Sequence, residues 1–205
     1  MTPVATAWAR IEDWMRRYTP GSLTVLAPPA TRDAIDAAAL AIGLPFPAEL
    51  VESLRRHDGL TEWANVLPEA PPLSAAGIVE QYRIRMEIAP DVGGFTPYTA
   101  GAEPWWHECW LPFGDADGDL QVIDLRPGPG HGRVGFAPHD NPAHFDDAWP
   151  SLTAYLTAVA DALDTGGTVG AWRAYVRAGG GLWWDLDGAT ELNGEPLRPA
   201  PTLDP

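Results

Sequence analysis

The sequence predicts an α+β fold, a mainly antiparallel sheet with helices packed around it. Helical periodicity dominates the first 90 residues, short apolar runs separated by turn residues follow between 105 and 137, and a helical pattern returns at 146–164. Helices and strands that cluster in this way favour an antiparallel sheet over the alternating pattern of a parallel α/β fold. A chain of 205 residues fits one domain with a sizeable core.

Four helices are predicted before the strands, from apolar residues at helical spacing and from capping residues at their ends. In chain order they cover Val4–Tyr18, Arg32–Ile42, Pro47–His57 and Leu73–Ile88. Thr31 and Ser74 are suitable N-caps for the second and the fourth helix. Gly43 is a suitable end for the second.

The strand predictions rest on short apolar runs bounded by turn residues. They are Trp63–Leu67, Trp110–Phe113, Asp119–Leu125, Arg133–Ala137 and Leu182–Leu186. Residues 89–104 form a long predicted loop. Asp146–Asp164 is a predicted helix, and 170–178 is weakly helical in pattern. These elements divide the chain into a main domain at 1–165, a C-terminal extension at 166–196 packed on it, and a proline-rich, disordered tail at 197–205.

Charge is the most informative property of the composition. Twenty-eight acids against 13 bases give a net charge of -15. Such a chain repels nucleic acid and anionic lipid and attracts basic proteins. Solubility alone is the other interpretation of this charge. We therefore expect a basic protein partner, no direct nucleic acid contact and no membrane contact.

The remaining bulk features favour the cytoplasm. The single cysteine, Cys109, excludes a disulfide within the chain. The first 20 residues carry acids and two tryptophans where a signal peptide needs an apolar run. No apolar stretch approaches the 18 residues of a membrane-spanning helix. A monomer or weak dimer is expected.

No motif of a common enzyme class occurs in the sequence, and we predict that the protein is not an enzyme and needs no cofactor or metal. The acidic run from Asp115 to Asp119 resembles a calcium loop. However, Leu120 and Arg126 stand where that loop needs glycine and a bidentate glutamate. The run is therefore interpreted as a polar turn or as part of a partner-binding patch.

His107 and Cys109 suggest a metal site or a nucleophile with its base, but their spacing suits neither. A cysteine beside Trp110 is more commonly a small buried apolar residue. A hydrolase that uses His107, Asp119 or Cys109 remains an alternative hypothesis.

Ten tryptophans include the adjacent pairs Trp105-Trp106 and Trp183-Trp184. Neighbours on a strand point to opposite faces, so one member of each pair is expected near the surface if the pairs are extended. Exposed aromatic residues beside acids suit a protein interface.

Several segments in order resemble a known family. They are Leu44-Pro45, Glu49-Leu50, Ser53–Gly59, Trp106–Phe113, Gly118-Asp119, Asp124–Gly130 and the late helix with Leu152, Tyr155 and Leu156. Together they resemble the SUKH superfamily, specifically its bacterial members similar to the fungal cell-wall-assembly regulator domain, over about Trp8–Leu163. The resemblance implies an α+β fold without known catalytic residues. It also implies that many bacterial members are immunity proteins that neutralise a cognate toxin, often a nuclease, whereas fungal members act as regulators in cell-wall signalling.

The first hypothesis is therefore an immunity-type protein whose acidic, tryptophan-containing face binds a basic toxin domain. The second is an intracellular regulator or scaffold without a toxin partner, and the third is the hydrolase. Charge and turn position, not the family, select the candidate partner contacts, which are Glu103, Trp105, Trp106, Glu108, Asp115 and Asp117.

Overall fold

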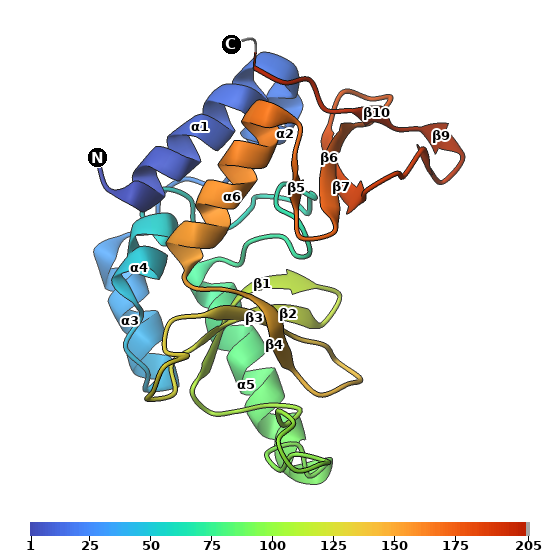
Figure 1. Ribbon diagram of the computed structural model, residues 1–205. Coiled ribbons are helices and arrows are strands. Elements are labelled where there is room, and N and C mark those ends of the chain that lie inside the picture. The colour runs from blue at the N-terminus through green and yellow to red at the C-terminus, as the bar shows by residue number, and fades with distance from the viewer. Residues whose placement is uncertain (204–205) are drawn as a thin grey trace.

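The computed structural model describes residues 1–203 and contains helices on both sides of an antiparallel sheet (Figure 1). The helices are α1 (Pro3–Tyr18), α2 (Pro20–Thr24), α3 (Arg32–Ile42), α4 (Ala48–Leu54), α5 (Ala75–Asp91) and α6 (Leu152–Thr165). Within this part of the chain, no helix combines the length and the apolar character needed to cross a membrane.

Four antiparallel strands form the first sheet, in the order β1-β2-β3-β4. They are β1 (Trp110–Ala116), β2 (Asp119–Asp124), β3 (Val134–Ala137) and β4 (His144–Trp149). A second sheet follows α6, in which β6 (Trp172–Val176) pairs with β5 (Thr168–Val169), β7 (Leu182–Leu186) and β10 (Arg198–Pro199). A short ribbon of β8 (Glu191–Leu192) and β9 (Glu195–Pro196) precedes β10. The predicted α+β fold with antiparallel pairing is confirmed.

The first sheet separates two apolar clusters. On one face, Leu120, Val122 and Ala137 pack with Tyr82 and Ala89 of α5. On the other face, strand residues that include Leu111 and Ile123 join a larger core, to which α1 and α6 contribute Trp8, Ile11, Tyr155 and Leu156. This alternation along the strands is expected of a sheet buried on both sides.

Local capping explains the helix ends that the sequence predicts well. The Thr31 side chain accepts a hydrogen bond from the Ala34 backbone N–H, and that of Ser74 accepts one from Gly77. The α3 helix has the predicted bounds, because its cap and its final glycine lie next to it in sequence.

Three element predictions are wrong. Trp63–Leu67 is irregular rather than a strand, and Asn65 instead exchanges side-chain hydrogen bonds with the backbone of Trp184. The helix predicted from Asp146 begins at Leu152, because His144–Trp149 pairs with β3. The weakly helical 170–178 segment contains β6, which pairs with β7 across a glycine turn.

The predicted disordered tail is also wrong for the described residues 197–203, and 204–205 lie outside them. Arg198 and Pro199 pair with β6. The Trp14 Nε1 then donates to the Pro201 carbonyl at 2.9 Å, and the Tyr18 hydroxyl donates to that of Thr202 at 3.0 Å. These contacts with α1 satisfy the backbone of a proline-rich segment. The boundaries between the main domain and its extension stay a prediction.

The His57-Asp58-Gly59 segment joins three parts of the fold. His57 Nε2 lies 2.9 Å from Glu12 of α1, and Asp58 Oδ1 accepts the Ala75 N–H at the start of α5 at 2.7 Å. Gly59 has φ +72°, and a Cβ there would lie 2.5 Å from the backbone nitrogen of Ser74. Only glycine fits both the left-handed backbone and this close approach.

Candidate partner-binding site

The tip of the β1–β2 hairpin and the loop after β3 form one acidic edge of the first sheet. We call the group Asp115, Asp117, Asp119 and Asp140 the acidic edge. Asp115 Oδ1 accepts the Gly118 N–H at 2.8 Å, which closes the hairpin turn. Asp119 Oδ1 lies 2.8 Å from His139 Nδ1 and accepts the His139 N–H at 2.9 Å, so the two loops adjoin.

Arg85 of α5 binds the backbone of both loops of the acidic edge. Its guanidinium donates to the carbonyls of Pro138 (3.1 Å), Ala137 (3.0 Å) and Gly118. Burial lowers the pKa of Arg85 to about 10, although the charges of Asp119 and Asp115 oppose that shift. Because Arg85 is only 3% exposed, its charge is largely withheld from solvent while the carboxylates in front of it stay accessible.

Gln81, one turn before Arg85, donates to Asp115 Oδ2 at 2.9 Å. Asp115 is therefore half-buried and fixed, whereas Asp117 at the tip of the turn is exposed, with φ +54°. A short acidic turn anchored at both ends presents its charges in one geometry.

Trp105 and Trp106 do not lie on the surface, contrary to the interface prediction. They are 6% and 0% exposed. The two residues belong to an irregular segment rather than a strand, so the alternation of faces does not apply. Arg85 lies over both rings, 4.5 Å from the Trp105 centroid and 5.8 Å from that of Trp106, and Trp105 Nε1 donates to the His139 carbonyl at 2.9 Å.

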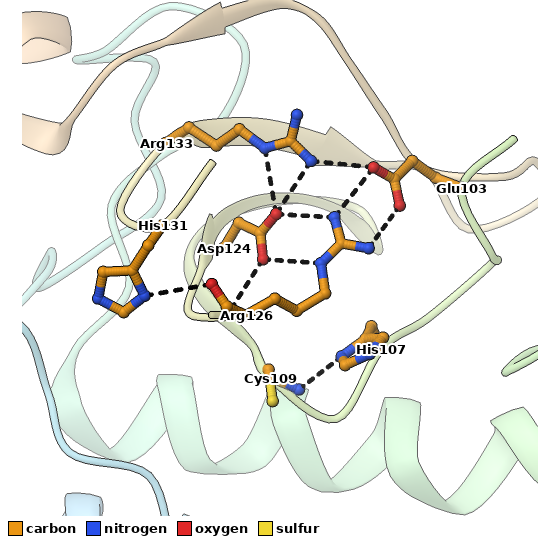
Figure 2. A network of polar contacts seen from close by, with 7 residues as sticks. All are labelled: Glu103, His107, Cys109, Asp124, Arg126, His131 and Arg133. Atoms are coloured by element: carbon orange, nitrogen blue, oxygen red, sulfur yellow. Dashed lines mark hydrogen bonds and ion pairs between the residues drawn. The ribbon is translucent and has the colours of Figure 1, made fainter. Parts of the chain in front are cut away.

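Glu103 is held in an ion network at the opposite end of the sheet (Figure 2). Its carboxylate accepts hydrogen bonds from Arg126 (2.7 and 2.9 Å) and Arg133 (2.9 Å). Asp124 accepts from the same two guanidinium groups at 2.7–3.1 Å. Two acids and two bases thus satisfy one another, and the network ties the loop before β1 to the end of β2.

The surroundings of the network strengthen it. Arg126 lies 5.2 Å from the Trp110 centroid, and Arg133 lies 4.0 Å from that of Phe145. Hydrogen bonds from Arg126 lower the pKa of Glu103. Burial opposes ionisation of Asp124, but the hydrogen bonds from Arg126 and Arg133 outweigh it and lower that pKa as well.

The six predicted contacts do not form one face. Glu103 and the exposed Glu108 precede the Trp110 end of β1, whereas Asp115 and Asp117 lie at its other end. At about 3.3 Å per residue, β1 separates the two groups by roughly 20 Å. The acidic edge therefore keeps two of the predicted residues, and the structure adds Asp119 and Asp140.

The residues of the hydrolase hypothesis are also separated. Asp119 and Asp124 lie at opposite ends of β2, roughly 17 Å apart at the usual strand rise. Cys109 lies at the Asp124 end, where its carbonyl accepts the Leu125 N–H at 2.9 Å. Asp119 cannot therefore act on a group bound at Cys109.

His107 does not activate Cys109. The His107 Nδ1 accepts the Cys109 backbone N–H at 3.0 Å (Figure 2), so this nitrogen is not directed at the thiol. Burial, followed by the charges of Glu108 and Asp124, raises the pKa of Cys109, which is the reverse of the shift that makes a reactive thiolate. Among residues 1–203, no group of three or more His, Cys, Asp or Glu side chains is arranged to hold a metal ion.

The second tryptophan pair agrees with its prediction, because it lies on a strand. Trp184 is fully buried and Trp183 is half-buried. The Trp183 ring lies 6.0 Å from that of Trp63, which is 62% exposed. The exposure of Trp63 was not predicted from the sequence, because Trp63–Leu67 was predicted to be a strand.

Sequence reasoning also missed Arg85, Arg126 and Arg133. Arg126 lies in the segment Asp124–Gly130 that carried the family resemblance, and Arg133 follows the glycine-rich turn 127–132. An arginine among the apolar positions of α5, where Ile78, Tyr82 and Ala89 face the sheet, was the available signal for Arg85.

Comparison with known families agrees with this architecture. The model of the SMI1 / KNR4 family (SUKH-1) matches residues 29–158, a range that contains α3 to β4, the acidic edge and the ion network. The chain belongs to the SMI1 / KNR4 family of the SUKH superfamily. None of the curated proteins compared with the chain matches it.

Proposed function

We propose that this protein is an immunity-type binding module that neutralises a basic toxin domain through its acidic edge. The observation that carries the proposal is the edge itself, in which Asp115, Asp117 and Asp119 lie in one hairpin and the contact between Asp119 and His139 joins this hairpin to the loop that carries Asp140. A nuclease toxin presents a basic cleft for phosphate, and a group of neighbouring carboxylates suits that cleft. The toxin class is an inference from this charge.

The negative charge of the chain is expected to raise the rate of association with a basic partner more than the affinity of the complex. The net charge of -15 attracts a basic protein over a Debye length, and the fixed acids orient it. Complementary charge of this kind raises the association rate and falls in effect as salt rises.

The candidate residues then divide into three roles. Asp115 and Asp117 contact the partner directly, together with Asp119 and Asp140, while Glu108 acts on it from a distance. Glu103, Trp105 and Trp106 act as positioning residues, because their contacts lie within the fold.

The proposal assigns no catalytic step to the chain. The His107 Nδ1 accepts the backbone N–H of Cys109 and is not directed at its thiol, and Asp119 lies at the end of β2 opposite to Asp124, which is near Cys109. A cytoplasmic location fits a protein that meets its toxin inside the producing cell, and it remains part of the proposal.

The test begins with capture of partners from lysate of the source cells, at low and moderate salt, followed by their identification. The proposal predicts a basic protein that is released as salt rises and stops growth when it is expressed alone. Co-expression of the wild-type chain should restore growth, and Asp117→Asn/Asp140→Asn should restore it poorly. Glu191→Gln/Glu195→Gln, two exposed acids on the β8–β9 ribbon, is the matched control.

Two results would contradict the proposal. Capture of signalling or cell-wall proteins alone, none of them toxic, would favour the regulator. Full rescue by the edge variant would show that the acidic edge does not contact the toxin.

A further inference from the structure

A groove of about 630 Å³ runs between α3 and α5, on the side of α5 that faces away from the acidic edge. Its α3 wall consists of alanines, Ala34, Ala37, Ala38 and Ala41. Short side chains along one wall leave space that a larger side chain would fill. The α5 wall contributes Val79 and Ile84, so apolar side chains line both sides of the groove.

Further exposed apolar residues lie on α5 and in the turn after it. Ile84, Ile88, Val92 and Phe95 recur at intervals of three or four residues and are each 40–48% exposed. Leu40, at the end of α3, is 84% exposed. Of the nine large hydrophobic residues exposed in the described chain, six lie between Leu40 and Tyr98 on these two helices and the following turn. Exposed apolar residues that gather on two neighbouring helices and the turn after them indicate a binding site more often than scattered single residues do.

The charges along the groove are mainly negative. Asp58, Glu80 and Glu87 line it, against the single base Arg83. The Asp58 carboxylate already accepts a hydrogen bond from the Ala75 backbone N–H at the start of α5. Within residues 1–203, neither Glu80 nor Glu87 has an ion pair or a side-chain hydrogen bond. Their carboxylates are exposed on α5 and remain available to a ligand.

We propose that this groove binds a basic amphipathic helix of a partner protein. Its apolar face would lie on the alanine wall and the exposed apolar residues of α5, with residues at i, i+3, i+4 and i+7 as anchors. Its lysines or arginines would face Glu80 and Glu87. A second copy of the chain is a poor occupant, because two rims of like charge on two chains of net charge -15 repel each other. Anionic lipid is repelled for the same reason.

This inference does not depend on the proposed function, because Gln81 and Arg85 link the acidic edge to α5 while Glu80, Ile84 and Glu87 line the groove on the side toward α3.

The test uses an 18-residue fluorescent peptide with leucine on one helical face and lysine on the other. Binding to the full chain is followed by fluorescence anisotropy. Ala37→Trp fills the groove without changing charge, and Glu80→Lys/Glu87→Lys reverses its rim. We expect each to weaken binding roughly tenfold or more, a loss of about 1.4 kcal/mol. Circular dichroism verifies that each variant is folded.

Two charge-matched controls locate the effect. Glu191→Lys/Glu195→Lys changes the net charge equally at the distant β8–β9 ribbon, and Asp117→Lys/Asp140→Lys does so at the acidic edge. Both are expected to change the affinity less than about twofold at 0.15 M salt, where distant charges are screened.

Equal weakening by all the charge reversals, or full binding by Ala37→Trp, would overturn the groove assignment and would leave the proposal for the acidic edge standing. No binding of the peptide to the wild-type chain would also overturn it. A dimer in sedimentation equilibrium that Ala37→Trp dissociates would assign the groove to a second copy instead.

Discussion

The guanidinium of Arg85 lies 4.5 Å from the centre of the Trp105 ring and donates to the carbonyls of Gly118, Ala137 and Pro138. One buried side chain thus connects α5, the predicted aromatic residues and the acidic hairpin tip. Trp105 and Trp106, which were expected on an interface, are buried against this arginine, whereas Asp117 and Asp140 of the acidic edge are exposed.

Arg85→Met should destabilise the fold by about 3 kcal/mol, because three carbonyls lose their charged donor in a buried setting. Urea unfolding measures the change. Arg83→Met is the matched control on the same helix, since Arg83 is exposed and a substitution there should stay within about 0.5 kcal/mol. Similar losses for both variants would show that Arg85 does not hold the hairpin and the β3 end together.

Asp124→Asn should cost more stability than Glu103→Gln. The Asp124 side chain is 3% exposed and that of Glu103 is 24% exposed, although each accepts from both Arg126 and Arg133. Because Asp124→Asn removes a buried charge and leaves two guanidinium groups without it, we expect the free energy of unfolding to fall by about 3 kcal/mol. For Glu103→Gln, whose carboxylate is more solvated, we expect a fall of about 1 kcal/mol. Thermal unfolding of the two variants gives the order, and the reverse order would contradict this account of the network.

Stability should fall in acid as Glu12 takes up a proton. Burial opposes its ionisation, but hydrogen bonds from His57 and Arg56 outweigh this and lower the pKa of Glu12 from 4.5 to about 2. A lowered carboxylate pKa contributes stability that is complete above about pH 4.5 and is lost as pH falls toward 2. The contribution at pH 7 is about 3 kcal/mol.

Glu12→Gln tests this contribution by urea unfolding between pH 2 and 7. The variant should be less stable at pH 7, and its stability should depend less on pH between 4.5 and 2. A curve parallel to that of the wild type would show that another group controls acid unfolding.

Gly59→Ala should destabilise the fold more than Gly93→Ala. Both glycines have positive φ, +72° and +64°, so both substitutions carry the strain of a left-handed backbone, about 1 kcal/mol. At Gly59 the added Cβ would also lie 2.5 Å from the Ser74 nitrogen, whereas at Gly93 no atom of residues 1–203 lies within 4 Å of it. Guanidinium unfolding of both variants separates close approach from backbone strain, and equal losses would rule out the former.

Elements with local signals could be predicted from the sequence. The α3 and α5 helices begin next to the residues that cap them, Thr31 and Ser74. The β6 strand could not be predicted in this way, because two of its three partners, β7 and β10, lie later in the chain. The β4 strand depends in turn on its pairing with the preceding β3, and this pairing replaces the helix that the local sequence pattern suggests from Asp146.

The candidate site was predicted in part for the same reason. Asp115 and Asp117 lie in a turn that the sequence marks clearly, and the structure places them on the acidic edge. Trp105 and Trp106 are packed against Arg85, which lies some 20 residues earlier in the chain. The Glu103 carboxylate is bound by Arg126 and Arg133, which lie more than 20 residues later. Contacts between distant segments leave no local pattern.

The rate at which the captured basic partner associates with the protein, measured by stopped-flow over a range of salt concentrations, tests the central claim most directly. We predict a rate that falls steeply with salt, and that Asp117→Asn/Asp140→Asn lowers it several-fold at low salt while Glu191→Gln/Glu195→Gln leaves it nearly unchanged. Equal rates for the wild type and the edge variant would contradict the claim that the acidic edge receives the partner.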